Sequence, residues 1–417
     1  MTNPPFQSRQ KLKPALASLV LGLLALGLSA CASHPKTSGP AKPANAEADL
    51  NCADENAKPR VSCAINPAAA FDPIGQLWIA WSQHGKVYVS RSNDLGSSFS
   101  PAVAVNPVAE SFDAEEGARP KIVPTKAGAV YVAWTKGQGQ TGQVRFSRSL
   151  DKGRTFTAPV TLSYDPARLA SLAVNNRDYV YLAWTSGGSL DVSAKNGGPH
   201  AGAELYYAYS SNGGRSFHPE QKISDQACAC CQASIKVDVK QLPVLLWRQL
   251  GAGQTSAVVL NHFAAKDKPG LIQQIGEDQG KTEDCQGPAL SIVPKYGYFV
   301  TWPSRDDAHK GLLFSSSEDQ GKNFSPPKSL GQSAQTLEPD ILADEHSIHL
   351  TWKQTDGAKS IAFAQDSLDG GQTWSTPRRL AEAEGDTDQP FLLDYQGHHY
   401  VAWQTDDQGF RLIPLGD

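Results

Sequence analysis

An eight-residue pattern, Ser-x-Asp-x-Gly-x-x-aromatic, recurs five times in this 417-residue chain, once with Asn in place of Asp. In a tight hairpin turn the Asp side chain can accept hydrogen bonds from backbone amides about two residues further on. The Gly can adopt the positive φ that such a turn requires, and the aromatic side chain can pack onto the sheet beneath. A pattern that recurs in register indicates internal structural repeats. The Asp or Asn positions are Asp94, Asp151, Asn212, Asp319 and Asp369.

A second repeated feature is a short apolar segment that ends in tryptophan. Such segments recur at intervals of 50 to 63 residues and end at Trp81, Trp134, Trp184, Trp247, Trp302, Trp352 and Trp403. Each is preceded by another predicted strand, and most are followed by a third strand, the Asp-containing turn and a fourth strand. Four strands in each period of roughly 50 residues predict an all-β fold, a β-propeller of four-stranded blades. We expect the tryptophans to lie in the core between blades.

The seven tryptophan segments favour seven blades. The last unit stops at Asp417 before a fourth strand. We therefore expect the segment near residues 50–65 to supply that strand and close the ring, because an open ring would leave sheet edges exposed.

The repeated turn resembles the Asp-box of the sialidase (BNR-repeat) superfamily, and the resemblance covers most of the chain from about Val61 onward. It implies that the Asp-box lies on the turn between the third and fourth strands of a blade, where it is structural and far from any active site. Well-studied sialidases have six blades, so six is the alternative count. The resemblance identifies a fold better than a reaction.

The first residues predict export and lipidation. Arg9, Lys11 and Lys13 precede an apolar run over residues 17–28 that is short for a membrane span. Leu28-Ser29-Ala30-Cys31 resembles a bacterial lipobox. The resemblance implies diacylation of the Cys31 thiol, cleavage before Cys31 and acylation of the new amino terminus, with membrane lipid as the partner. Cys31 is followed by Ala32 and not by an Asp, which would resemble an inner-membrane retention signal. The resemblance therefore favours the outer membrane, with the protein on its periplasmic or its outer side.

The domain boundaries follow from composition. Residues 1–30 are the predicted lipoprotein signal peptide, and residues 31–49, rich in Ala, Pro, Lys and Ser, are a predicted flexible tether. Residues 50–417 are the predicted propeller domain. Removal of three basic residues with the signal peptide would leave 35 basic and 42 acidic residues, a formal charge of −7. That balance argues against nucleic acid as a partner.

Six cysteines beyond Cys31 predict disulfides or a metal site. An even number in an exported protein favours disulfides, and Cys52 with Cys63 would fix the closing segment. The loop before the fourth Trp-bearing hairpin carries a second group, and a loop of the next unit carries one more cysteine. These four would pair among themselves, or would bind Cu or Zn through their soft sulfurs. They are Cys228, Cys230, Cys231 and Cys285.

Hairpin geometry places charged residues beside these cysteines. If residues 232–238 pair with 244–248 in a hairpin, Arg248 lies roughly opposite Ala233. Counting from the corresponding turn of the next unit places Arg305 and Asp306 near Cys285. Further loops should reach the face on which propellers usually bind ligands. The candidate ligand-binding residues are Arg119, His200, Arg248, Arg305 and Asp306.

Sialidase chemistry would need three arginines for the substrate carboxylate, a Tyr activated by a Glu, and an Asp acid/base. Arg60-Val61-Ser62 and Arg119-Pro120-Lys121 match the family's first arginine motif poorly. No catalytic residue is therefore transferred. The sequence predicts a membrane-anchored, sialidase-like propeller that binds a glycan, a protein or a metal without catalysis, with an exo-α-sialidase as the alternative.

The predicted lipid anchor can be tested at Cys31. The substitution Cys31→Ser removes the acylated thiol, so the protein should leave the membrane fraction, whereas the wild type should sediment with membranes and carry acyl chains by intact-mass spectrometry. A variant that still sediments, together with a wild type that has no acyl mass, would contradict lipidation.

Overall fold

The computed structural model describes Cys52, Asp54 and residues 56–112, 118–138, 141–163, 166–187, 202–251, 255–278, 286–306, 310–331, 336–355, 357–385 and 387–416. Residue contacts divide the chain into two compact units, and one of them holds residues 58–417. Residues 1–51, which include Cys31, lie outside the described residues, as do His200 and Cys285. In the described part, no helix is long and apolar enough to cross a membrane.

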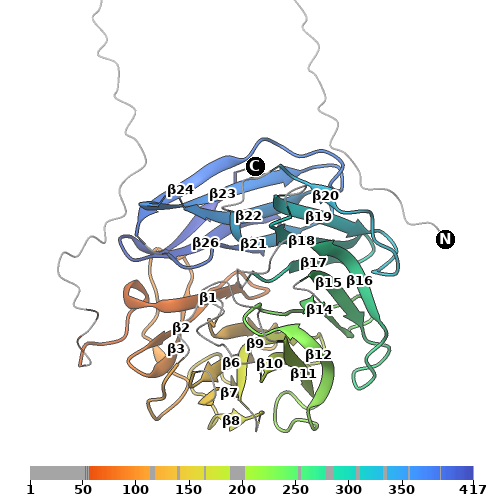
Figure 1. Ribbon diagram of the computed structural model, residues 1–417. Coiled ribbons are helices and arrows are strands. Elements are labelled where there is room, and N and C mark those ends of the chain that lie inside the picture. Colours follow the sequence, from red (N-terminus) through yellow and green to blue (C-terminus); the bar gives the residue numbers. More distant parts are fainter. Residues whose placement is uncertain are drawn as a thin grey trace, which may run out of the picture. The chain divides into compact units, whose positions relative to one another are not determined.

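The fold is all-β, as the sequence predicts, and Figure 1 shows its sheets. Within the described residues, five sheets have three or four antiparallel strands that pair in chain order. Their strands are β1 (Ile65–Phe71), β2 (Leu77–Gln83), β3 (Lys86–Ser92) and β4 (Val103–Ala104); β5 (Lys121–Pro124), β6 (Val130–Lys136), β7 (Gln143–Ser149) and β8 (Val160–Thr161); β17 (Ala289–Val293), β18 (Gly297–Ser304), β19 (Gly311–Ser317) and β20 (Lys328–Ser329); β21 (Thr336–Ala343), β22 (Ile348–Thr355), β23 (Lys359–Ser367) and β24 (Arg378–Glu384); and β25 (Phe391–Tyr395), β26 (His398–Thr405) and β27 (Gly409–Pro414).

A sixth sheet consists of two such groups joined edge to edge. Its strands are β9 (Ala167–Val174), β10 (Val180–Ser186), β11 (Gly202–Ser210), β12 (Gln221–Cys228), β13 (Ser234–Val237), β14 (Pro243–Leu250), β15 (Ser256–His262) and β16 (Ile272–Asp278). The groups meet where β12 pairs with β14 through Ala227 and Gln249. This junction lies one residue before Cys228, so it fixes the start of the cysteine loop.

The first strands of successive groups pack on one another in a closed order. β1 contacts β5, β5 contacts β9, β9 contacts β13, and the sequence continues through β17, β21 and β25 back to β1. This circular order gives the unit a β-propeller-like architecture. The first strands therefore surround a common centre, where the candidate site lies.

The junction between the last and first sheets differs from the expected strand addition. Val61–Cys63 forms a short 3₁₀ helix, η1, which contacts β27 without joining its sheet. Val61 and Phe410 pack on Ala64, Ile79 and Trp81 in one apolar cluster. In the described residues, this side of the junction is therefore held by side-chain packing where the sequence analysis expected strand pairing.

The repeated tryptophans are core residues, as predicted. All seven are less than 2% exposed. Trp134 of β6 packs with Val87 and Val89 of the preceding sheet, and Trp352 of β22 packs with Phe314 of the preceding sheet. Burying an aromatic side chain of this size stabilises the fold by roughly 4–6 kcal/mol on an area basis. Each tryptophan therefore joins its own group of strands to the previous group.

The five Asp-box turns share one hydrogen-bond arrangement. The Gly amide donates to the Ser hydroxyl at 2.8–2.9 Å. The Asp or Asn oxygen accepts from that hydroxyl at 2.7–2.9 Å and from the amide four residues further on at 2.8–3.0 Å. The amides lie further on than the expected two residues because the Ser hydroxyl already accepts from the nearer Gly amide. These hydrogen bonds lower the pKa of Asp94 to about 2, and the one from the Ser98 hydroxyl makes the largest contribution.

The aromatic residue of the turn packs toward the preceding sheet. The Phe217 ring lies edge-on to Phe146 with centroids 5.0 Å apart, and Trp374 lies edge-on to Phe314 at 5.1 Å. The turn therefore fastens the outer part of one sheet to its neighbour, while the repeated tryptophan does so nearer the cavity side.

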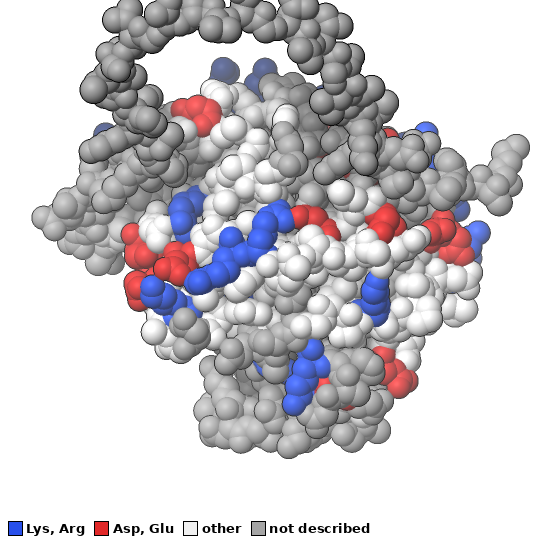
Figure 2. Space-filling model, turned by 90° about the horizontal axis from the view of Figure 1, so that it is seen from above, with Lys and Arg blue, Asp and Glu red and all other residues white. Residues whose placement is uncertain are grey.

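Charged side chains on the outside carry little of this stability. On the side of the molecule shown in Figure 2, Lys and Arg side chains lie among Asp and Glu side chains. The pairs Lys359–Glu382 and Arg379–Glu382 are examples of exposed ion pairs, with N–O distances of 3.1 and 2.7 Å. Exposed pairs of this kind contribute about 0–1 kcal/mol each, so the apolar contacts between sheets dominate.

Packing at the turn can be tested at Gly371. A Cβ there would lie 2.3 Å from Phe314 Cε1 at a φ of +91°, whereas a Cβ at Gly357, with a φ of +92°, would meet nothing within 4 Å. Both substitutions to Ala incur positive-φ strain, so Gly371→Ala should lower the free energy of unfolding by a further 1–3 kcal/mol or so relative to Gly357→Ala. Urea titration measures the difference, and equal destabilisation would show that the turn does not pack tightly on Phe314.

Candidate ligand-binding site

A cavity of about 280 Å³ lies where the first strands meet. We call it the central cavity. Every first strand contributes to its lining, with Ala68 from β1, Lys121 from β5, Ser171 from β9, Lys236 from β13, Ala289 from β17, Asp340 from β21 and Phe391 from β25. Alternate side chains of a strand point to opposite faces, so such a lining follows from seven strands converging on one centre.

Arg119 enters the cavity from the segment before β5 and is 7% exposed. Its Nη2 donates to Asp388 Oδ1 and to the Gln389 carbonyl, both at 3.0 Å, and its guanidinium carbon lies 4.7 Å from the centroid of the Phe391 ring. Its Nε is buried and has no hydrogen-bond partner among the described residues. The buried ion pair therefore joins the second sheet to the last one and leaves one donor unsatisfied.

Two lysines line the same cavity. Lys121 is half-buried and its Nζ donates to Gln232 Oε1 at 3.2 Å. Burial, and then the nearby charge of Arg119, hold the pKa of Lys121 well below its usual range. Lys236 on β13 is more exposed. Within the described part of the chain, neither lysine forms a salt bridge with a carboxylate, so the cavity has a surplus of positive charge.

Asp340 is the one carboxylate among the described residues that line the cavity, and that lining contains no tyrosine. Its Oδ2 accepts a hydrogen bond from the Leu392 amide at 2.8 Å, and its Oδ1 accepts one from the Ile341 amide at 2.9 Å. Asp340 therefore holds β21 against the last sheet, and this lining lacks the pair of acidic groups that glycoside hydrolysis uses.

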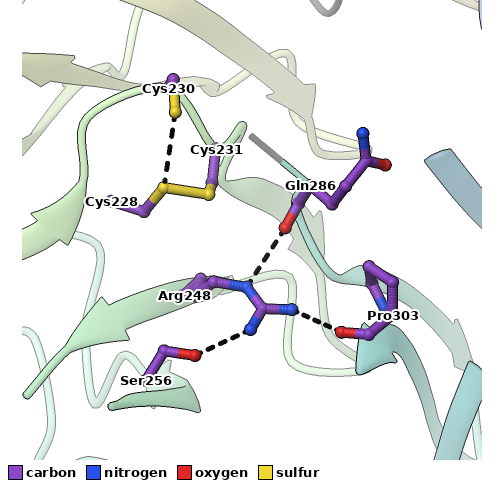
Figure 3. The surroundings of a disulfide bond; sticks show 7 residues. All are labelled: Cys228, Cys230, Cys231, Arg248, Ser256, Gln286 and Pro303. Atoms are coloured by element: carbon purple, nitrogen blue, oxygen red, sulfur yellow. Dashed lines mark hydrogen bonds between the residues drawn. A yellow bond between two sulfur atoms is a disulfide. The ribbon is translucent and has the colours of Figure 1, made fainter. Parts of the chain in front are cut away.

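The cysteine loop forms one wall of the cavity. Cys228 and Cys231 form a disulfide with an S–S distance of 2.03 Å, and Cys230 Sγ lies 3.9 Å from Cys228 Sγ (Figure 3). Cys230 is also disulfide-bonded, and it lines the cavity. The sequence is compatible with disulfides and with a metal site at these cysteines. The structure contains the Cys228–Cys231 disulfide, and disulfide sulfurs do not act as thiolate ligands. The pairing of Cys230 within the predicted group of four, which also includes Cys285, stays a prediction.

Hydrogen bonds fix the residues that follow the cysteines. Gln232 Nε2 donates to the Ala170 carbonyl at 3.3 Å, and the Ser171 hydroxyl donates to the Ala233 carbonyl. A Cβ on Gly287 would lie 2.5 Å from the Gln232 carbonyl oxygen, so the segment before β17 approaches this loop closely. The loop is therefore held from the β9 side and from the β17 side.

Arg248 occupies a different place from the one that the sequence analysis expected. Ser234 pairs with Leu246, so the register continues to Gln232, not Ala233, opposite Arg248. Its guanidinium donates to the Gln286 and Pro303 carbonyls at 3.2 and 2.7 Å and to Ser256 Oγ at 2.8 Å (Figure 3). Arg248 is 4% exposed and is not among the lining residues. It therefore links β14 to the next sheet.

The other predicted residues are distributed as follows. Arg119 lines the central cavity, whereas Arg305 and Asp306 follow β18 and are not among its lining residues. His200 and Cys285 lie outside the described residues. Cys52 and Cys63 are each disulfide-bonded, and their pairing with each other stays a prediction.

The sequence analysis missed Lys121, Lys236 and Gln232. The sequence did indicate that both lysines lie on first strands. Lys121 follows Pro120 at the start of one such strand, and Lys236 alternates with buried Ile235 on another. Strand alternation alone could not show that both face one cavity, because that depends on how seven distant segments converge.

A Ser–His–Asp arrangement lies outside the cavity. Ser347 Oγ is 2.8 Å from His349 Nε2, and His349 Nδ1 is 2.7 Å from Asp366 Oδ1. This is the order of a nucleophile, a base and an orienting carboxylate. Ser347 is only 6% exposed, however, and its hydroxyl is also within hydrogen-bond distance of Asp344 Oδ1, at 3.1 Å. The hydroxyl is therefore not presented to a substrate, and we assign the arrangement a structural role.

No protein-family model and no curated protein matches the sequence. Among solved structures, the BP39L lectin from Burkholderia pseudomallei superposes with a TM-score of 0.61 at 9% identity, over 85% of this chain and 97% of the lectin. The Hadza microbial sialidase Hz136 gives 0.48 at 14% identity, over 82% of this chain and 73% of the sialidase. A mutant of NanB sialidase from Streptococcus pneumoniae gives 0.45 at 8% identity, over 81% and 82%. The lectin superposition shows a shared fold.

The role of Arg119 can be separated from that of an exposed cation. Arg119→Met would leave Asp388 buried without its cation and should lower the free energy of unfolding by roughly 3–5 kcal/mol. Lys222→Met, which breaks a pair with Glu204 whose side chains are 44% and 40% exposed, should cost about 1 kcal/mol or less. Urea titration compares them.

A double variant, Arg119→Met with Asp388→Asn, should recover part of the loss because it removes the stranded charge as well. Equal effects of Arg119→Met and Lys222→Met would contradict the buried ion pair.

Proposed function

We propose that this protein is a lipid-anchored, non-catalytic propeller that binds an anionic glycan in the central cavity. The observation that carries the proposal is the set of cations that line this cavity. Two lysines have no carboxylate partner in the described part of the chain, and Arg119 keeps an unsatisfied donor at Nε. Burying cationic groups costs stability unless a partner neutralises them. A ligand that carries carboxylate or sulfate groups would supply that partner.

A glycan is favoured over other anions for two reasons. The cavity combines cations with neutral hydrogen-bonding groups, Gln232 and Ser171, and with the apolar ring of Phe391. Such a mixture suits a sugar, which presents hydroxyl groups together with an apolar face. A lectin is among the proteins with a similar fold, and this likeness is consistent with the proposal without carrying it.

Binding is favoured over hydrolysis by the content of the described lining. A sialidase-type reaction would need a tyrosine nucleophile and further acidic groups, and these residues offer one carboxylate, Asp340, that is already hydrogen-bonded. The exo-α-sialidase stays the alternative because the Asp-box repeats resemble that superfamily.

The proposed architecture has seven blades, with β9–β12 and β13–β16 counted separately and β25–β27 as the last. Its support is the circular order of contacts among the seven first strands. The proposed location is the outer membrane, through acylated Cys31, and its support is the lipobox resemblance.

The proposal can be tested with the full-length protein in detergent micelles on an array of acidic and neutral glycans. Binding should be confined to acidic glycans and should fall by about tenfold or more in Lys121→Met, which removes a charge next to the ligand. Lys322→Met, on an Asp-box turn, is the matched control and should bind as the wild type does. Release of a fluorogenic sialoside by the wild type would favour the alternative, and binding unchanged by Lys121→Met would overturn the assigned site.

Lys121→Met should also stabilise the free protein. Because the folded pKa of Lys121 lies below the ordinary lysine value of 10.5, burial of this amine costs free energy at neutral pH, where the unfolded chain carries it protonated. That cost is lost as pH rises from the folded pKa toward about 10.5. The melting temperature of the variant should therefore exceed that of the wild type at pH 7, and the gap should narrow at alkaline pH. A variant that melts lower at pH 7 would show that Lys121 stabilises the fold.

A further inference from the structure

We propose that reduction by a dithiol converts the cysteine loop into a site for one Cu(I) ion, held by the thiolates of Cys228, Cys230 and Cys231. This site would form one wall of the central cavity, and it does not depend on the glycan proposal. Three observations carry it: the separation of the sulfurs, the fixed ends of the loop, and the charge and burial around it.

One pair of sulfur atoms already has the spacing that one metal ion requires. A metal–sulfur bond of about 2.3 Å places two thiolates of one centre roughly 3.8–4.0 Å apart. Cys228 Sγ and Cys230 Sγ are 3.9 Å apart, and all three Sγ atoms lie within 4.8 Å of one another. Opening the Cys228–Cys231 bond would free these two sulfurs to bind the same ion as separate thiolates.

The backbone around the sulfurs is held independently of the disulfide. Cys228 ends β12, where Gly202 pairs with Cys228 and Ala227 pairs with Gln249. After the cysteines, hydrogen bonds from Gln232 to the Ala170 carbonyl and from Ser171 to the Ala233 carbonyl fix the loop to β9. The three side chains therefore stay close to one another after reduction, which limits the ordering cost of metal binding.

The surroundings suit Cu(I). Thiolates are soft ligands of the kind that bind Cu(I). In the described residues the group consists of three cysteines with no further His, Asp or Glu, so every ligand atom that it offers is a soft sulfur. All three are at most 7% exposed, and Leu250 packs against them. A Cu(I) centre with three thiolates has a net charge of −2, which the cationic lining that includes Lys121 and Lys236 would partly offset.

The chemistry balances as follows. Two equivalents of a dithiol reduce the Cys228–Cys231 disulfide and the disulfide that contains Cys230, and two equivalents of cyclic disulfide are formed. Binding of Cu(I) then forms three copper–sulfur bonds and releases three protons from the three thiols. The metal keeps its oxidation state, so no further oxidant or reductant is required.

The test is anaerobic titration of the full-length, dithiol-reduced protein with Cu(I), in competition with a chromogenic Cu(I) chelator. The reduced protein should bind one Cu(I) tightly, and the oxidised protein should bind none at this site. Cys230→Ser should weaken binding by about 100-fold, because two sulfurs replace three, and the double variant Cys228→Ser/Cys231→Ser should abolish it. The matched control, Cys52→Ser/Cys63→Ser, also lacks two thiols but should bind as the wild type does.

Near-UV circular dichroism after reduction, before metal is added, checks the claim that the loop is held without its disulfide. The signal should be retained, and its loss would overturn the proposal. Three other results would also overturn it: no tight Cu(I) binding, binding that Cys230→Ser leaves unchanged, or one Zn(II) bound in preference to Cu(I).

Discussion

In the described residues, each group of strands is fixed to the previous group by a buried tryptophan near the end of its second strand. These side chains are all but inaccessible to solvent, and each fills the space between two sheets. Loss of one such contact would separate two neighbouring sheets and disturb the circular order of first strands. The position of every lining residue in the central cavity depends on that order.

The two faces of the fold carry different chemistry as a consequence. The Asp-box turns use their serine, aspartate and glycine in local hydrogen bonds, and their aromatic residues pack inward. Few hydrogen-bonding groups of these turn residues therefore remain available to a ligand. The opposite face carries the segments before the first strands, where Arg119, the cysteine loop and Gln286 approach the centre. The candidate functions therefore concentrate there.

The sequence predicted the repeating parts of this structure because each repeat depends on interactions between residues that are close together in the chain. The all-β class, the tryptophans in the core and the positive φ of the turn glycines all follow from short patterns. The sequence analysis failed where position depends on several distant segments. Arg248 was expected at the ligand face, yet its register is shifted by one residue and its donors go to the Gln286 and Pro303 carbonyls. Lys121 was overlooked because its significance depends on Arg119, Lys236 and Gln232 meeting it across the cavity.

We propose that the cationic central cavity is the ligand site, so a bound oligosaccharide should cover its two lysines. Quantitative acylation of lysines in the full-length protein, with and without sulfated and uronic-acid-containing oligosaccharides, measures that coverage. We expect the oligosaccharides to protect Lys121 and Lys236 from acylation and to leave Lys152 and Lys322, on the Asp-box turns, unchanged. Protection of Lys152 and Lys322 with full labelling of Lys121 and Lys236 would contradict it.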